Sequence, residues 1–509
     1  MSTGSLNVRR RERELAALAA GERVDVAVVG GGVTGAGIAL DAASRGLTVA
    51  LVEARDLAFG TSRWSSKLVH GGLRYLAHGE LGLARESAVE RGIMMTRTAP
   101  HLTRAMPQLF PLYPSTSRAQ QALVATGLRA GDVLRRIART PASVLPPPRS
   151  IPAALARALA PGLASSGLRG ALLAYDGALV DDARLVVALA RTAASFGARI
   201  LTRLPALSVS GDRVRVRDAL SGDSFEIGAR VVINATGVWA GELAPTVRLR
   251  PSLGSHLVLA PGTVPMGTTS VNIGVPGETN RFVFLLPQPD GRVYLGLTDE
   301  PLSGEIPSVP VVPESDVDFL LELASSVLAR PVTRADVAGS YAGLRPLVDG
   351  PESGRSADLS RKHVVVTGPD GVLTAVGGKL TTYRRMAQDA VDAAVSHAGL
   401  TLARPCRTTH LPLLGAAPRT RLSLVDAPAR LVAKYGTEAP RVAALGSDLL
   451  WPGTEITAAE IIWAIQHEGA LDIEDVLERR TRLSLIPADA TAATPRIHDL
   501  VDKALTDLT

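Results

Sequence analysis

The sequence contains little sulfur and few aromatic residues. Cys406 is the one cysteine among 509 residues, and aromatic residues make up 4% of the chain. One thiol cannot form a disulfide within the chain, and it cannot build a metal site from thiolates. We therefore predict a bystander thiol at Cys406, no metal site, and a reducing cytoplasmic compartment.

Long apolar runs are also missing. The apolar stretch at 24–43 is interrupted by Asp25, Asp41 and several glycines, whereas a membrane span needs about 18–20 consecutive apolar residues. Arginines 9–11 are followed by glutamates and not by an apolar segment with a cleavage site, so no signal peptide is expected. The chain is too long for one hydrophobic core and indicates two or three domains.

Residues 24–53 have the pattern of a dinucleotide-binding βαβ unit. An apolar strand leads into Gly30, Gly32 and Gly35, and a second apolar strand, 48–52, ends at Glu53. The glycines permit a tight turn, close approach of a pyrophosphate and close helix packing, and a carboxylate at this position can accept from ribose hydroxyls. We predict a bound dinucleotide cofactor; the alternative is a glycine-rich turn in an ordinary α/β unit.

A second motif follows the unit at 65–76. Ser65 and Ser66 precede the glycine pair Gly71-Gly72, and Arg74-Tyr75 follows directly. Paired glycines allow the backbone to pass close to the cofactor ring. An arginine presents a cation to an anionic substrate. The segment therefore predicts contact with both cofactor and substrate.

The rest of the chain alternates between two kinds of pattern. The buried strand at 230–235 ends at Thr236-Gly237, where a nucleotide can approach the backbone, while 252–300 contains short strands with a hairpin signal at Asp290-Gly291. The pattern after residue 420 is helical. We expect an α/β fold in which a Rossmann-like cofactor domain is interleaved with an antiparallel cap domain, followed by an all-α domain. The predicted ranges are 20–80, 170–250 and 336–400 for the cofactor domain, 81–169 and 251–335 for the cap, 401–419 for a linker, and 420–509 for the helical domain.

Several motifs resemble those of the FAD-dependent glycerol-3-phosphate dehydrogenases. In chain order they are GGGVTGAG, LVEARDLAFGTS, SSKLVHGGLRYL, YDGALVDDARL, NATGVWA, GSHLVL, YAGLRPL, GGKLTTYR and HEGALDIEDVLERRTRLSL. The resemblance implies an FAD-binding fold and oxidation of sn-glycerol 3-phosphate to dihydroxyacetone phosphate by hydride transfer to FAD, with electrons passed to a quinone. One departure is Val238, where many relatives carry proline, and we expect it to change loop stiffness alone.

The resemblance also assigns roles to individual residues. Arginine holds phosphate oxygens bidentately, and Arg74, Arg345 and Arg361 are the candidates, with Tyr75 as a hydroxyl donor. Arg361 sits between Ser360 and Lys362 and fits a solvated face nearly as well. The remaining implied FAD-binding residues are Ser65, Ser66, Gly71, Gly72, Thr236, Gly237, Gly377, Gly378, Lys379, Leu380 and Thr381, in addition to Gly30, Gly32, Gly35 and Glu53.

Three residues are predicted to be catalytic: His256, Arg345 and Lys379. A histidine titrates near operating pH and suits a general base, so His256 is the predicted base; its alternative is a core histidine with a satisfied hydrogen bond. Lys379 follows two glycines and can place a cation near the pyrimidine edge of the flavin; its alternative is a solvated lysine. His70, Asp181 and Asp182 are expected to be structural.

Positive charge is concentrated between residues 118 and 169. This segment has eight arginines and one acid, Asp132, although the whole chain carries a net charge of only +6. Apolar residues recur at helical spacing in 118–139, so the segment predicts a basic amphipathic helix that docks on the inner face of the cytoplasmic membrane or packs on its own domain as a solvated helix. A homodimer is also compatible with the sequence.

Two other functions fit parts of the pattern. An amino-acid or amine oxidase of the same fold is disfavoured because a clamp for a dianion exceeds what one carboxylate needs. An RNA-binding flavoprotein is suggested by the isoelectric point of about 9.7, but residues 118–169 contain no aromatic side chain for base stacking. We therefore expect no nucleic-acid partner.

Overall fold

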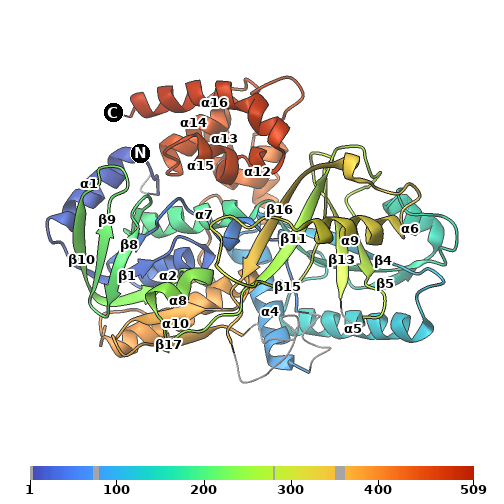
Figure 1. Cartoon of the computed structure of the whole chain (residues 1–509), viewed down its shortest axis with the longest axis horizontal. Helices are drawn as coiled ribbons and strands as arrows, with labels where there is room; N and C mark the ends of the chain where they lie inside the picture. Colours follow the sequence, from blue (N-terminus) through green and yellow to red (C-terminus); the bar gives the residue numbers. More distant parts are fainter. Residues whose placement is uncertain (1–3, 73–78, 279–280, 350–361, 509) are drawn as a thin grey trace.

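The computed structural model describes residues 4–72, 79–278, 281–349 and 362–508. Figure 1 shows a helix-covered sheet on the left, a second sheet on the right, and a group of C-terminal helices (red) above them. This arrangement confirms the predicted fold class. No helix in the described ranges is both long enough and apolar enough to span a bilayer.

The first sheet is the cofactor-binding sheet. Its strand order is β17-β18-β10-β1-β2-β7, with β17 antiparallel and the other five parallel. Strands such as VALV of β2 are apolar throughout because helices and a strand meander cover both faces. The bounds are β1 (Val24–Val29), β2 (Val49–Val52), β7 (Arg199–Leu201), β10 (Ser224–Asn234), β17 (Val364–Thr367) and β18 (Leu373–Val376).

Helices cover one face of this sheet and a strand meander covers the other. α2 (Val33–Ser44), α7 (Asp182–Ser195) and α10 (Tyr383–His397) share one core with the sheet. On the other face, α1 (Val8–Ala19) packs with β8 (Ala206–Ser210) and β9 (Arg213–Arg217), and β9 continues the pairing from β10.

The second sheet is mainly antiparallel. Its order is β15-β11-β14-β13-β12-β4-β6-β3, with β16 beside β11 and β5 beside β6. One face packs on α6 (Ala153–Leu159) and α9 (Glu314–Ser325). The bounds are β3 (Leu68–Val69), β4 (Thr103–Pro111), β5 (Arg149–Ile151), β6 (Ala171–Leu179), β11 (Ser252–Leu259), β12 (Ser270–Gly274), β13 (Phe282–Pro287), β14 (Val293–Gly296), β15 (Glu300–Pro301) and β16 (Val337–Arg345).

Three of these strands come from ranges that we assigned to the cofactor domain. β3, β6 and β16 pair within the second sheet, so the chain crosses between the sheets more often than the sequence suggested. Strand pairing joins residues that are far apart in the chain, and neither apolar pattern nor glycine spacing reveals the partner.

Two helices lie against the second sheet near its lower edge in Figure 1. α4 (Leu81–Ile93) leads into the sheet, and α5 (Arg118–Ile137) is the basic helix that the sequence predicted. Ser117 and Gln120 form a capping box at the start of α5. Leu128 is buried against β6, which fixes one side of the helix to the sheet.

The C-terminal part is helical, as predicted. Its own core gathers residues such as Ile461, Ile465 and Ile497. Arg479 and Arg480 lie outside this core and form ion pairs with Asp56, which follows β2. All three side chains are buried. The helices are α11 (Arg419–Leu422), α12 (Ala429–Tyr435), α13 (Ala439–Ala443), α14 (Ala458–His467), α15 (Ile473–Asp475) and α16 (Pro487–Thr506), with the single turns η8 (Val476–Arg480) and η9 (Leu483–Leu485) between α15 and α16.

Candidate active site

The glycines after β1 form a cradle at the start of α2. Gly30 has φ +111°, and a Cβ there would lie 2.6 Å from the carbonyl oxygen of Ala235. A Cβ on Gly35 would overlap the carbonyl oxygen of Gly30, so the helix packs against the turn only because both positions lack side chains. A Cβ on Gly32 would meet only the Ser62 hydroxyl, at 3.2 Å. The start of α2 therefore keeps space and positive dipole for a pyrophosphate.

Glu53 ends β2 beside this cradle. Its Oε2 accepts from the Gly31 N–H at 2.6 Å, and its Oε1 accepts from the Arg55 N–H at 2.8 Å. Burial raises the pKa of Glu53. A carboxylate offers about four acceptor sites, so the two backbone bonds leave capacity for the ribose hydroxyls, and this role of Glu53 stays a prediction.

Two further glycine positions lie at the same edge of the first sheet. β1, β10 and β18 are neighbouring parallel strands, and their carboxyl ends lead to Gly30, Thr236-Gly237 and Gly377-Gly378. Gly237 and Gly377 have φ +62° and +82°, and among the described residues no heavy atom lies within 4 Å of a Cβ placed on Gly237. Nucleotides bind at such carboxyl ends in open parallel sheets.

Lys379 directly follows this last glycine pair. It is the N-cap of η6 (Leu380–Thr382), and Thr381 is buried within this turn. A short helical turn that begins after two glycines presents its N–H groups toward the edge of the sheet. Lys379, Leu380 and Thr381 thus belong to the predicted cofactor edge, and their role toward the flavin stays a prediction.

His256 lies in β11, between β14 and β16, and is fully buried. Its Nε2 lies 2.8 Å from the Ser66 hydroxyl, and its ring stacks on Tyr341 with centroids 4.6 Å apart and planes at 9°. Nδ1 has no hydrogen-bond partner among the described residues. Burial lowers the pKa of His256 well below its ordinary value, and the Lys67 and Arg345 cations add to this effect. The imidazole is therefore neutral near neutral pH and able to accept a proton.

Arg345 projects from the same face of the second sheet as His256. The β11–β16 register pairs Ser252 with Arg345 and His256 with Tyr341, so four residues of strand separate them, about 13 Å between backbone positions. The Arg345 side chain is 17% exposed and its guanidinium donates to Asp299 at 3.1 Å and to the Thr298 carbonyl at 3.0 Å. The predicted phosphate clamp is therefore held in place by a carboxylate.

The segment before β3 brings the two sheets together. Ser65 donates from its N–H and its hydroxyl to Asp182, and Ser66 reaches His256. Gly71 donates to Asp176, and a Cβ on it would overlap the Arg91 guanidinium. The ion pair between Arg91 and Asp176 is buried, so packing alone accounts for this glycine. A Cβ on its neighbour Gly72, which has φ +81°, would lie 3.0 Å from the Ala84 backbone.

Three predicted substrate residues, Arg74, Tyr75 and Arg361, lie outside the described residues. The two aspartates expected to be structural are placed as such: Asp181 caps α7, and Asp182 pairs with Lys67 at 3.5 Å. Cys406 contacts Asp41, and burial raises the pKa of its thiol, which fits a bystander role.

Sequence reasoning did not single out three residues that shape this site: Lys67, Tyr341 and Asp299. Lys67 and Tyr341 were inside quoted motifs, but nothing in the sequence shows that both are buried or that the Tyr341 ring contacts His256 and Lys67. Asp299 carried no signal at all, because its partner Arg345 is 46 residues away.

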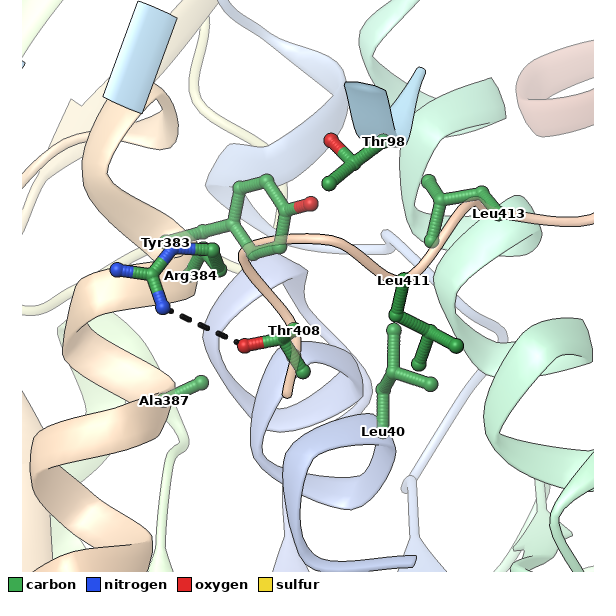
Figure 2. A pocket seen from close by; sticks show the side chains of 9 residues that line it. Leu40, Thr98, Tyr383, Arg384, Ala387, Thr408, Leu411 and Leu413 are labelled. Atoms are coloured by element: carbon green, nitrogen blue, oxygen red, sulfur yellow. Dashed lines mark hydrogen bonds between the residues drawn. The ribbon is translucent and has the colours of Figure 1, made fainter. Parts of the chain in front are cut away.

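A small cavity of about 10 Å³ lies elsewhere in the cofactor domain (Figure 2). Leu40 of α2, Tyr383 and Arg384 of α10 and the segment with Thr408 line it, and Arg384 donates to the Thr408 hydroxyl at 3.4 Å. The space suits about one water molecule, so it is a packing gap and not a substrate site. Within the described ranges, no cluster of three or more histidine, cysteine or acidic side chains could hold a metal ion.

The residues at the carboxyl edge of the first sheet fit a flavin dinucleotide. Side-chain-free positions lie where the pyrophosphate must approach the backbone, and Glu53 lies beside them. FAD bound there would supply a hydride acceptor.

Comparisons with known proteins agree with this geometry. Residues 25–384 match the family described as FAD dependent oxidoreductase, and residues 406–506 match the C-terminal domain of alpha-glycerophosphate oxidase. The chain is 54% identical to glycerol-3-phosphate dehydrogenase 1 of Mycobacterium bovis over 96% of both chains. It is 34% identical to the mitochondrial glycerol-3-phosphate dehydrogenase SDP6 of Arabidopsis thaliana, over 95% of this chain and 83% of the relative.

A solved structure supports the same assignment. The glycerol-3-phosphate dehydrogenase from Bacillus halodurans, solved in complex with FAD, matches with a TM-score of 0.73 and 25% identity, covering 99% of this chain and 97% of the other. The family match spans well over half of the chain, and the identity to the mycobacterial relative extends over nearly all of it. The chain therefore belongs to the family of FAD-dependent glycerol-3-phosphate dehydrogenases.

Proposed function

We propose that this protein oxidises sn-glycerol 3-phosphate to dihydroxyacetone phosphate and passes the electrons to a quinone. The observation that carries the proposal is that the buried His256, whose pKa is lowered by burial, and the cation Arg345 lie on one face of the second sheet. Bound FAD would accept the hydride from the carbinol carbon. The relatives described above bear the name of this activity.

His256 has the proton-transfer role in this proposal. Its Nε2 points to Ser66, on the segment predicted to line the cofactor, whereas Nδ1 is enclosed. When substrate binds, its hydroxyl replaces the Ser66 hydroxyl at Nε2, and Nε2 accepts the hydroxyl proton as the hydride leaves. Before that exchange Ser66 orients the ring, and the stacked Tyr341 prevents the ring from turning.

Arg345 has the phosphate-binding role. Asp299 and the Thr298 carbonyl hold the planar guanidinium against β11, so little side-chain freedom is lost when a phosphate binds. Arg74, Tyr75 and Arg361 complete the proposed clamp, and Lys379 is proposed to stabilise the negative charge of the reduced flavin.

Anaerobic reduction of the flavin tests the proposal. The purified protein should be yellow, and glycerol 3-phosphate should bleach it while glycine, proline and other amino acids do not. His256→Asn should slow the bleaching by about 10²–10⁴-fold with unchanged flavin content. Bleaching by an amino acid alone would instead identify an amino-acid oxidase. Turnover with a quinone analogue, compared with peroxide yield in air, tests the acceptor.

We further propose that α5 docks on an anionic membrane surface. Its outward face carries arginines at 118, 129 and 136, with Leu123, Val133 and Ile137 among them at 49%, 53% and 52% exposure. This face is both basic and apolar, the combination that suits a bilayer interface. Each basic side chain near such a surface contributes about 1 kcal/mol.

Vesicle sedimentation tests the docking. The triple change of Arg129, Arg136 and Arg139 to glutamate should release the protein from phosphatidylglycerol vesicles while dye-linked activity survives. A matched control changes three exposed arginines of β9, at 213, 215 and 217, which alters net charge equally on another face. Equal release by both triple variants would contradict docking through α5.

A further inference from the structure

Lys67 is a buried lysine to which the proposed chemistry gives no role. It lies between Ser66 and β3, is 3% exposed, and has a left-handed backbone with φ +56°. Its ammonium lies 3.5 Å from Asp182 and donates to the Ser65 carbonyl at 3.2 Å. Burying a lysine is costly unless the charge is paired, so this position has a defined role.

The ammonium lies close to the aromatic ring that stacks on the proposed base. Lys67 Nζ is 4.7 Å from the centre of the Tyr341 ring and 5.4 Å from that of Tyr294. The Tyr341 ring is the one that stacks on His256, and its hydroxyl donates to the Ser65 carbonyl at 3.1 Å. Ser66, the chain neighbour of Lys67, reaches Nε2 of His256. Two neighbouring residues therefore contact the site: Ser66 bonds to His256 through its hydroxyl, and the Lys67 ammonium lies against the Tyr341 ring that stacks on His256.

The C-terminal domain completes this arrangement. Arg482, between η8 and η9, lies 3.2 Å from Asp181 and 3.9 Å from Asp182. A Cβ on Gly339 of β16 would overlap the Leu485 carbonyl oxygen, and Leu485 packs in one cluster with Tyr341. The helical domain therefore packs against the strand that carries Tyr341, and its Arg482 lies close to the carboxylate that pairs with Lys67.

The charged groups around His256 are unequal in sign. Lys67 and Arg345 are the cations whose charge opposes protonation, and Asp182 is the carboxylate that favours it. Asp182 is also bonded by Ser65 and faces Arg482, so its charge is shared among several donors. Burial raises the pKa of both Tyr294 and Tyr341, so these rings are neutral.

We propose that Lys67 is a positioning residue for proton abstraction: its buried ammonium, held by Asp182 beside the Tyr341 ring, keeps His256 neutral and ready to accept the substrate proton. The proposal rests on the assignment of His256 as the base. It places the C-terminal domain close to this arrangement, because Arg482 lies 3.9 Å from Asp182.

The pH dependence of flavin reduction tests this role. A neighbouring unit charge in partly buried surroundings shifts a pKa by roughly one unit at an effective dielectric constant of about 20. Lys67→Met should therefore move the acid limb of the reduction rate upward by about one pH unit, and Lys67→Arg should return it toward wild type. Asp182 keeps Ser65 and Arg482 as partners in the methionine variant, so no carboxylate is left unpaired.

Thermal unfolding of the holoenzyme provides a second readout. A buried neutral His256 has a lowered pKa, so the unfolded chain binds more protons below about pH 6.5 and the melting temperature falls as the pH decreases. Lys67→Met lets the folded state take up this proton at higher pH, so its melting temperature should fall less between pH 6.5 and 5 than that of the wild type.

Two controls separate the possible outcomes. Arg11→Met removes another buried cation, on α1, which pairs with Asp218. This change should lower stability without moving the acid limb of the flavin-reduction rate. If His256→Asn keeps its activity, the base assignment fails and the Lys67 proposal falls with it. If His256→Asn is inactive and Lys67→Met is slowed equally at every pH, the base assignment stands and the Lys67 proposal is refuted.

Discussion

The phosphate clamp can be tested by separating two roles of Arg345. Its guanidinium is bonded to Asp299, whose side chain is 8% exposed, and is proposed to bind the substrate phosphate. Arg345→Ala removes both interactions. Losing a hydrogen bond to a charged group costs about 1.5–3 kcal/mol, so kcat/KM for glycerol 3-phosphate should fall about 10- to 150-fold.

The same change should also destabilise the fold. Breaking a buried ion pair costs about 3–5 kcal/mol. Because Arg345 is 17% exposed, we expect the lower end of that range. The double variant Arg345→Ala/Asp299→Asn removes the unpaired carboxylate, so its melting temperature should recover while its activity on glycerol 3-phosphate stays low. Arg345→Lys keeps the charge but loses the bidentate fork and should fall between wild type and alanine.

The assay compares two substrates. Steady-state dye reduction is measured with glycerol 3-phosphate and with glycerol, which has no phosphate for Arg345 to bind. A clamp predicts a large loss on the first substrate and a much smaller loss on the second. Equal losses on both, or recovery of phosphate-substrate activity in the double variant, would refute the clamp.

Three further predictions concern cofactor binding and stability. Gly35→Ala should yield colourless protein, because its Cβ would overlap the Gly30 carbonyl oxygen and displace α2; a normal flavin spectrum would contradict this. Burial lowers the pKa of His101 to about 3, so below about pH 6.5 the unfolded chain binds a proton at this histidine that the folded chain does not. The free energy of unfolding should therefore fall by up to about 1.4 kcal/mol per pH unit toward pH 3. Urea titrations of His101→Leu should show a smaller dependence of that free energy on pH. Asp56→Asn should lower the free energy of unfolding by about 3–5 kcal/mol, because it leaves two buried arginines of the C-terminal domain without their shared carboxylate. As a control, Glu22→Gln at an exposed ion pair should lower it by less than about 1 kcal/mol. Similar melting temperatures for the two variants would show that the Asp56 ion pairs do not stabilise the contact between the domains.

The cofactor cradle was predictable because its causes are local. Gly30, Gly32 and Gly35 act on the turn and helix that immediately follow β1, and Glu53 ends the next strand along the sheet. A glycine that must adopt φ +111° or lie against a carbonyl oxygen leaves a signal in the sequence itself. The basic helix was predictable for the same reason, since helical periodicity and the cap at Ser117 are short-range features.

Other expectations needed correction or addition from the structure. The domain ranges did not anticipate that β3, β6 and β16 pair within the second sheet. In α5, Leu123 is exposed, which the helical spacing of apolar residues in 118–139 did not show. Such facts depend on which surface packs against which, and periodicity along one helix does not contain that information.

The sequence by itself determined the nucleotide-binding edge, the helical C-terminal part and the family resemblance, because each depends on residues within one or two elements. The tertiary structure alone decided that Lys67 and His256 both lie against the Tyr341 ring and that Arg345 is held by Asp299 on the same sheet face. The physical reason is that strand pairing and burial join residues separated by up to several hundred positions, and the energy of a charge depends on those neighbours.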